Sequence, residues 1–170
     1  MNKMVVLTKN EILKEIKKKR IKITPFKKEN IGPASIDLTL SNEFRIFKGK
    51  EKIIVDEKTD YRKYSKLVKA NKIEIGPGEF ILAITKEKIQ LPEDICGWLS
   101  GRSRFARLGL LVHITAAFVQ PGINNRQVLE MRNVSPNTLA VKAGIRICQL
   151  IIERTEGKAR YKGKFQKQEL

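Results

Sequence analysis

The densest group of chemically useful side chains lies in one glycine-bounded stretch, residues 101–109. Its sequence, Gly-Arg-Ser-Arg-Phe-Ala-Arg-Leu-Gly, places Arg102, Ser103, Arg104 and Arg107 within six residues. Such a turn can offer guanidinium groups, a hydroxyl and backbone N–H groups to phosphate oxygens. A solvated basic turn would have the same composition, so both interpretations stay open at this point.

A carboxylate follows inside an apolar run. Glu130 comes directly after Val128 and Leu129, in a stretch that begins with the turn-forming residues 120–125, Gln-Pro-Gly-Ile-Asn-Asn. Burial in such a run would tune a carboxylate for proton transfer, which makes Glu130 a candidate general acid or base. The alternative is an outward-facing Glu on an alternating strand.

The sequence lacks the motifs of several classes of enzyme. The one histidine, His113, lies in a strand-like stretch, and nothing places it beside Ser103 as the base of a Ser-His-Asp triad. The sequence also lacks the nucleophile elbow, the P-loop, the GxGxxG fingerprint and the H-x-E with P-C-x-x-C deaminase signature. Cys96 and Cys148 each stand alone in apolar stretches and are predicted to be buried free thiols. Zinc sites built from several His or Cys ligands are therefore excluded.

Length and charge limit the class of protein. A chain of 170 residues predicts a single domain, residues 1–170. Lys plus Arg exceed Asp plus Glu by 35 to 18, and the net charge of +17 favours anionic partners, unless it reflects only a solvated surface. No apolar run approaches the roughly 20 residues of a membrane span, and the apolar stretch near the start of the sequence is too short for a signal peptide. A cytoplasmic location and no membrane partner are expected.

The elements that must position these side chains are mostly strands. Residues 8–11, Thr-Lys-Asn-Glu, fit a capping box, and the apolar spacing predicts a helix over about 9–19 in an N-terminal arm, 8–20. Residues 56–72 are polar and aperiodic and predict an exposed excursion, while Trp98 is predicted in the core. Residues 104–109 could form one or two helical turns. Alternation and turn signals predict strands at about 21–24, 35–40, 44–47, 52–55, 80–85, 95–99, 110–119, 127–132, 138–142 and 145–153. The pattern is that of an all-β sandwich or jelly-roll barrel with a helical arm.

The C-terminal segment, 158–170, is basic and contains aromatic residues and glutamines. It could be a disordered tail. It could equally close over a ligand, with Lys164 on phosphate and Tyr161 or Phe165 against a sugar or base.

In order and spacing, these motifs resemble the dCTP deaminases of the dUTPase-like superfamily. The resemblance rests on 101–109, then Val112-His-Ile-Thr-Ala116, Pro121-Gly122 and Val128-Leu-Glu130. Further matching segments cover nearly the whole chain: Leu7-Thr8 with the helix, Ser35-Ile-Asp37-Leu, the turn 76–80, Leu91-Pro92, Gln149 and 164–168.

The resemblance implies a distorted jelly-roll or dUTPase-like β-barrel, a homotrimer with shared active sites, and zinc-independent hydrolysis of dCTP to dUTP and ammonia with Mg²⁺ on the triphosphate. Glu130 matches the catalytic glutamate, and Ser103 and Arg107 match residues that position the water and polarise the base. The other positions that match substrate-binding residues are Arg102, Arg104, Thr115, Ala116, Gln120, Val128, Gln149, Tyr161, Lys164 and Gln168.

Some residues depart from the family pattern. Gln120 stands where dUTPases and bifunctional deaminase–dUTPases carry an Asp that activates water, and a neutral amide cannot act as that base. Little dUTP diphosphatase activity is therefore expected. Glu130 also argues against dUTP diphosphatase activity, because plain dUTPases have an apolar residue at the matching position. The remaining departures concern the pocket and its closure: Arg104 for a small hydroxyl residue, Ile123 for an aromatic, Asn125 for Gly and Phe165 for Tyr.

Three functions remain as hypotheses. The first is a dCTP deaminase. The second is a dUTP diphosphatase, or a bifunctional enzyme, of the same fold. The third is a non-catalytic basic β-domain that binds nucleotides or nucleic acid. Nucleic acid is not the expected partner, because the sequence lacks the clustered aromatics on which single-stranded bases stack.

Overall fold

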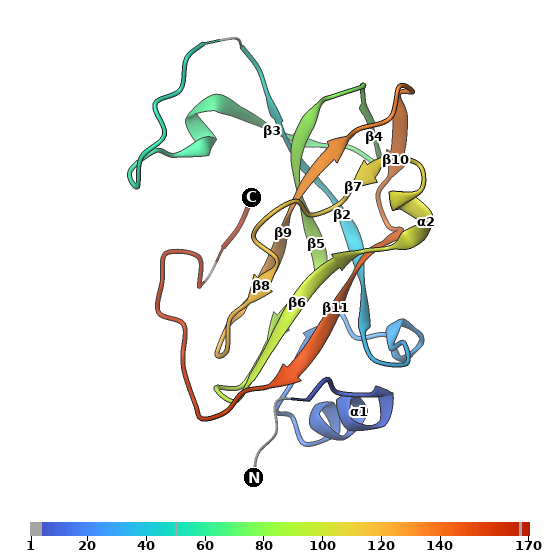
Figure 1. Ribbon diagram of the computed structural model, residues 1–170, viewed down its shortest axis with the longest axis vertical. Helices are drawn as coiled ribbons and strands as arrows, with labels where there is room; N and C mark the ends of the chain where they lie inside the picture. Colours follow the sequence, from blue (N-terminus) through green and yellow to red (C-terminus); the bar gives the residue numbers. More distant parts are fainter. Residues whose placement is uncertain (1–4, 50, 167) are drawn as a thin grey trace.

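In the computed structural model, which describes residues 5–49, 51–166 and 168–170, a mostly β structure surrounds a main core (Figure 1). The helical elements are α1 (Lys9–Lys17), α2 (Ser103–Ala106) and the 3-10 turns η1 (Lys28–Asn30) and η2 (Tyr61–Tyr64). The strands are β1 (Lys22–Thr24), β2 (Ile36–Phe47), β3 (Ser65–Lys69), β4 (Lys72–Ile75), β5 (Phe80–Gln90), β6 (Ile95–Gly101), β7 (Leu110–Leu111), β8 (Phe118–Val119), β9 (Asn124–Asn133), β10 (Leu139–Lys142) and β11 (Arg146–Arg154).

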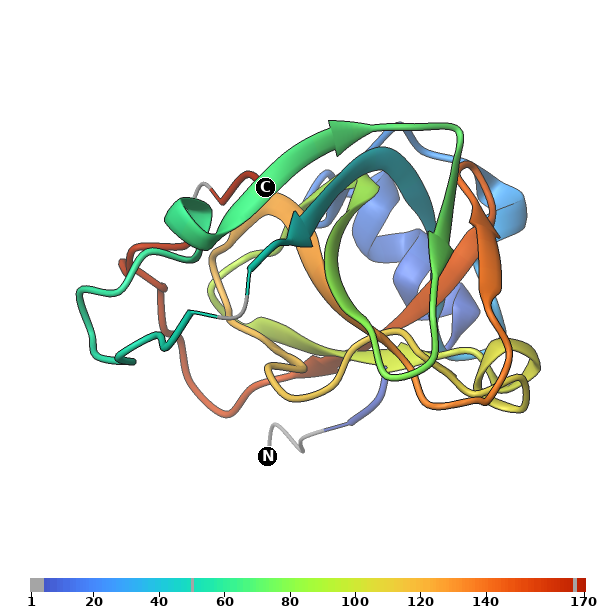
Figure 2. The same ribbon diagram turned by 90° about the horizontal axis from the view of Figure 1, so that it is seen from above.

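Nine strands form one curled sheet in the order β7-β9-β5-β2-β11-β6-β8, with β1 added to β5 and β3 to β2. All the pairings are antiparallel, and β4 pairs separately with β10. Figure 2 shows the sheet curling around the core. The predicted mostly β architecture with a short N-terminal helix is confirmed.

Strand β2 joins the two parts of the sheet, β7-β9-β5 on one side and β11-β6-β8 on the other. Its alternating residues Ile36, Leu38 and Leu40 are at most 1% exposed. One side of β2 pairs with β5, and the other pairs first with β11 and then with β3. The two strands predicted at 35–40 and 44–47 are therefore one long strand, with an irregular register between Leu40 and Phe44.

A bulge in β5 shapes the neighbouring strand β9. Residues 85–87 of β5 lie opposite the single residue Gln127, between the pairs Ile84–Val128 and Lys88–Arg126. The Thr85 hydroxyl accepts a hydrogen bond from the Gln127 backbone N–H at 2.9 Å, so the interrupted ladder is still satisfied. The bulge fixes the position of Gln127 in β9.

Helix α1 is held below the sheet by buried contacts and ion pairs. Ile12 is fully buried, and Glu15 is only 4% exposed. Glu15 accepts hydrogen bonds from Arg20 at 2.6 Å and from Arg154 at 2.8 Å. The predicted capping box does not form: Thr8 makes no side-chain capping bond in the structure, and Glu11 instead pairs with Lys14 at 2.7 Å.

Other predictions of local structure were wrong. Residues 52–55 form no strand; they lie in a projecting loop, where Ile54 is 75% and Val55 85% exposed (Figure 2). The predicted excursion 56–72 contains η2 and β3, which finds its partner in β2. Trp98 is 43% exposed because it lies on the outward face of β6, against Phe118.

The cysteines are free and buried, as predicted. Burial, followed by the nearby charges of Glu87 and Asp37, raises the pKa of the Cys148 thiol. Within residues 5–49, 51–166 and 168–170, no helix has the length and apolar character of a membrane span. Lys167 of the predicted closing segment and residues 1–4 lie outside the described residues.

Candidate active site

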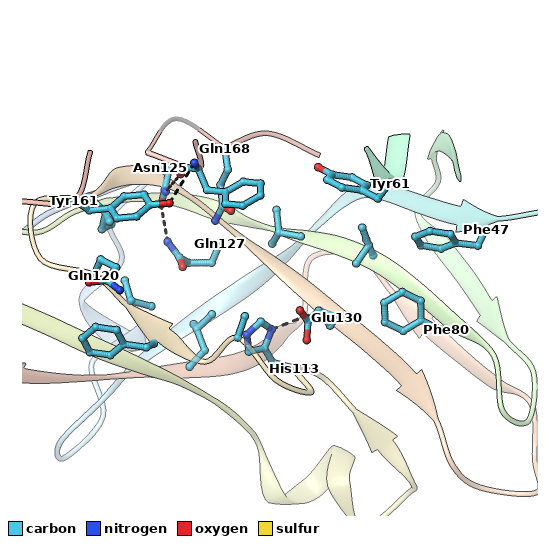
Figure 3. Close-up of a pocket in the computed structure, with 18 residues that line it drawn as sticks. Phe47, Tyr61, Phe80, His113, Gln120, Asn125, Gln127, Glu130, Tyr161 and Gln168 are labelled. Atoms are coloured by element: carbon cyan, nitrogen blue, oxygen red, sulfur yellow. Dashed lines mark hydrogen bonds between the residues drawn. The ribbon is translucent and has the colours of Figure 1, made fainter. Parts of the chain in front are cut away.

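A cavity of about 550 Å³ opens between β9, the chain around 113–123 and the C-terminal segment (Figure 3). Its wall combines a few polar groups with many apolar ones, as is common for small-molecule sites. The lining residues that carry polar groups are His113, Gln120, Asn125, Gln127, Glu130, Tyr61, Tyr161 and Gln168.

Glu130 lies in the wall of this cavity, on β9. Its Oε2 atom accepts hydrogen bonds from the Thr115 backbone N–H at 2.9 Å and from the Thr115 hydroxyl at 2.8 Å. Both bonds go to one carboxylate oxygen, so the side chain is oriented while Oε1 makes no hydrogen bond within the described part of the chain. An oriented carboxylate with one free oxygen can exchange protons with a bound molecule.

The loop that supplies Thr115 was predicted as a strand. Residues 110–119 instead form two short strands, β7 and β8, and residues 112–117 leave the sheet between them. The Ala117 N–H donates to the Thr115 carbonyl at 2.9 Å, which tightens this turn. The departure from the sheet brings Ala116 to the cavity wall and Thr115 to the Glu130 carboxylate.

His113 also lines the cavity, a position that the sequence did not indicate. Its Nδ1 atom accepts a hydrogen bond from the Glu130 backbone N–H at 3.4 Å. Its Nε2 atom is buried and finds no partner among the described residues. The imidazole therefore supports the backbone of the carboxylate-bearing strand.

A second polar group lies where the C-terminal segment crosses the cavity (Figure 3). The Tyr161 N–H donates to the Pro121 carbonyl at 3.0 Å, and the Gln168 side chain donates to the Arg126 carbonyl at 2.9 Å. The segment is thus held against the 120–126 turn, and it brings Tyr161, Phe165 and Gln168 to the cavity wall.

Aromatic residues form the opposite lobe of the cavity. Phe47 and Phe80 pack with ring centroids 5.4 Å apart, and Tyr61 lies beside them in the wall. These residues come from β2, η2 and β5, so only the folded sheet brings them together. Sequence reasoning missed them, since each belongs to an ordinary apolar or polar run.

The basic turn lies away from this cavity. In both views α2 and the C-terminal segment are on opposite sides of the molecule (Figures 1 and 2). Arg102 and Arg146 both pair with Asp37, at 3.3 and 3.4 Å, and Arg102 donates to the Arg146 carbonyl at 3.0 Å. Ser35 donates to Gln149 nearby at 3.4 Å. The charged group of Asp37, Arg102 and Arg146 is called the Asp37 cluster below.

The predicted site residues therefore fall into two groups. The cavity brings together Glu130, Ala116, Gln120, Val128, Tyr161 and Gln168, with Thr115 bonded to Glu130. The residues of the other group do not line the cavity within one chain: Arg102, Ser103, Arg104, Arg107, Gln149 and Lys164. Among the described residues, no three His, Cys, Asp or Glu side chains gather in a way that could hold a metal ion.

The matching family model and two relatives of similar sequence carry the name dCTP deaminase. The family model DCD, described as dCTP deaminase-like, matches residues 6–155. The "dCTP deaminase, dUMP-forming" of Methanobrevibacter smithii is 35% identical over 156 residues, which cover 88% of this chain and 80% of that protein. The protein of the same name from Acidothermus cellulolyticus is 36% identical over 160 residues, covering 92% and 84%.

Solved structures agree on the fold. The 2'-deoxycytidine 5'-triphosphate deaminase from Agrobacterium tumefaciens matches with a TM-score of 0.71 at 16% identity, over 90% of this chain and 49% of that one. This chain thus spans about half the length of that protein. The dUTPase from phage phi11 of S. aureus matches with a TM-score of 0.52 at 12% identity, over 85% and 96%. The predicted dUTPase-like fold is confirmed.

Proposed function

The chain belongs to the dCTP deaminase-like family, and we propose that it deaminates dCTP, hydrolysing the bond between C4 of the cytosine and its amino group and releasing ammonia. The single observation that carries this proposal is the orientation of Glu130 in the cavity wall by both hydrogen-bond donors of Thr115. The names of the relatives at 35 and 36% identity support the same reaction.

Deamination needs one group that can both take up and deliver protons. In the proposed reaction, water attacks C4 of the cytosine and Glu130 takes a proton from it. Glu130 delivers this proton to the ring N3. It then takes the second proton from the new C4 hydroxyl and delivers it to the amine, so that the C4–N bond breaks, ammonia leaves and the C4 oxygen becomes a carbonyl. Thr115 holds Oε2 throughout, and Oε1 is the atom that exchanges protons. As the resemblance implies, the proposed reaction uses no zinc.

The triphosphate needs more positive charge than the cavity wall offers. Arg102, Ser103, Arg104 and Arg107 lie outside the cavity of their own chain. We therefore propose that a second copy supplies this turn, in a homotrimer with shared sites. There Arg102 and Arg104 would bind phosphate, and Ser103 and Arg107 would position the water and polarise the base. Mg²⁺ bound through the phosphate oxygens would neutralise part of the charge.

The C-terminal segment would complete the site. Tyr161 and Gln168 already lie on the cavity, while Lys164 and Gln149 would need the assembled site to reach the nucleotide. Ordering of such a segment over a substrate excludes water from the reacting atoms. The Ala116 backbone and Val128 lie in the same wall as Glu130, where the pyrimidine would bind.

The test is to incubate the protein with dCTP and Mg²⁺ and to measure ammonia. We expect ammonia release, and we expect Glu130→Gln to lower kcat by roughly 100-fold or more while leaving dCTP binding nearly unchanged. Glu153→Gln is the matched control, because Glu153 contacts Trp98 outside the cavity. Undiminished turnover in Glu130→Gln would overturn the assignment.

A second candidate function is the further conversion of dUTP to dUMP, and the names of the curated relatives favour it. Gln120 opposes it, because its amide lines the cavity where the resemblance implies an Asp that activates water. Measurement of pyrophosphate from dCTP and dUTP separates the two. Release of pyrophosphate would correct the expectation drawn from Gln120 and assign the chain the product named for its relatives.

A further inference from the structure

Two buried side-chain amides lie in the cavity wall and have no role in the proton transfer proposed above. Asn125 is 6% exposed and Gln127 is 5% exposed, and both line the cavity from β9 (Figure 3). Buried amides usually have their hydrogen-bonding groups satisfied, so their partners show how they are arranged.

The partners fix the orientation of both amides. The Phe165 carbonyl can only accept, and the Asn125 Nδ2 atom donates to it at 2.8 Å. The Asn125 Oδ1 atom must therefore accept, and it does so from the Gln127 Nε2 atom at 2.7 Å. The chain of donors and acceptors, called the amide relay below, has only one direction, and it leaves the Gln127 Oε1 atom as its free end.

That free end is an acceptor at a defined place. Within the described residues no group donates to the Gln127 Oε1 atom, although the residue lines the cavity. The Gln127 backbone is pinned by Thr85 in the β5 bulge. Gln127 lies three residues from Glu130 on the same strand, roughly 10 Å along it. Both residues line the same cavity, so a nucleotide with its C4 carbon at Glu130 has room to place its sugar at Gln127.

We propose that the amide relay couples the docked C-terminal segment to the sugar of the nucleotide, with the Gln127 Oε1 atom accepting a hydrogen bond from the 3'-hydroxyl. The inference rests on the proposed function, because it takes a deoxynucleotide as the ligand. Asn125 and Gln127 are positioning and specificity-determining residues here. Asn125 stands where the resemblance implies Gly, and a glycine could not form the relay.

The test compares dCTP with 2',3'-dideoxy-CTP, which lacks the hydroxyl. Dissociation constants are measured in a Glu130→Gln background so that neither nucleotide turns over. Gln127→Leu should weaken dCTP binding by about fivefold, the factor equivalent to ~1 kcal/mol for one hydrogen bond, and leave dideoxy-CTP binding unchanged. Asn124→Ala is the control, since Asn124 is an exposed neighbour on β9. An equal loss for both nucleotides would mean a structural role only and would overturn the proposal.

A second measurement follows the C-terminal segment itself. Asn125→Gly removes the bond to Phe165, so trypsin should cleave at Lys162 and Lys164 several-fold faster than in the parent protein. An unchanged cleavage rate would overturn the coupling between relay and segment.

The ammonia assay separates this inference from the proposed function. Hydroxyl-dependent binding without ammonia release would leave the relay standing and remove the deaminase. Ammonia release, together with equal affinity of the parent protein for dCTP and dideoxy-CTP, would support the deaminase and overturn the role proposed for the relay. A parent protein that binds neither nucleotide would overturn both.

Discussion

Two of the regions in which arginines meet carboxylates lie beside α1 and beside α2, and the balance of charge differs between these two. Beside α1, Glu15 and Asp94 face Arg20 and Arg154, two carboxylates for two arginines. The contacts are 2.6 to 2.8 Å long. Each charge is matched within the chain, and Glu15 is buried.

Beside α2 the charges are not matched. Asp37 is the one carboxylate that pairs with Arg102 and Arg146 in the described residues. Arg104 and Arg107 are exposed and make no ion pair there. Positive charge in excess of its internal partners favours an external anion.

We infer from this comparison that partner balance, rather than residue type, distinguishes a structural charge cluster from the phosphate-binding surface proposed above. Both regions contain several arginines close in space. The α1 region satisfies them internally and stabilises the fold, whereas the Asp37 cluster and the turn beside it keep charge available. The following predictions test that distinction.

The largest expected effect concerns the division of the site between copies. Arg107→Ala and Glu130→Gln should each lower deamination by about 100-fold or more. If the α2 turn acts on the cavity of a second copy, co-purified oligomers that contain both variants should regain measurable activity. Ammonia release from differently tagged, co-expressed chains is the measurement. Hybrid oligomers that form but stay inactive would place both residues in one chain's site.

The next effect is on stability and should occur only in the balanced region. Glu15→Gln removes a buried charge that two partly exposed arginines contact, and it should lower the free energy of unfolding by about 1.5–3 kcal/mol. Denaturant titration measures it. Glu11→Gln is the control, because the Glu11–Lys14 pair is exposed and should contribute less than about 0.5 kcal/mol. A similar loss in both variants would mean that the buried network has no special role.

Much of the fold follows from sequence pattern because alternation is local. Strands β9, β10 and β11 lie on predicted runs, β2 joins two of them, β5 continues one from residue 85 to residue 90, and the helix was predicted within two residues of its end. The errors arose where tertiary pairing decided the outcome. Residues 65–69 carry little alternation and become β3 only because β2 offers an edge, and Val55 fits a strand pattern but finds no partner.

The site was predictable only in part for the same reason. The motif order indicated Glu130 and the C-terminal segment, which the structure brings to one cavity. Phe47 and Phe80 reach it through the sheet and His113 through the loop between β7 and β8, and sequence reasoning assigned none of the three to the site. The Asn125 and Gln127 relay depends on the β5 bulge and on the path of the C-terminal segment, neither of which follows from spacing alone.

The smallest effect is a pH dependence that belongs to the balanced region. Burial would raise the pKa of Glu15, but hydrogen bonds from Arg154 and Arg20 outweigh it and lower the pKa below its ordinary value of 4.5. The same competition between burial and Arg20 lowers the pKa of Asp94 below 3.8. Because both folded-state values are depressed, their stabilisation is fully present above about pH 4.5. It is lost as the pH falls through the lowered values.

The free energy of unfolding, measured from pH 7 to pH 3, should therefore decrease below pH 4.5. The decrease should be smaller in Glu15→Gln, because the variant has no carboxylate to protonate at position 15. Glu11→Gln should follow the parent protein. Parallel curves for the parent and Glu15→Gln would show that the acid sensitivity arises elsewhere. Because the α2 region has few carboxylates to protonate, acid should weaken the fold beside α1 before it changes the charge that the arginine turn presents to an anion.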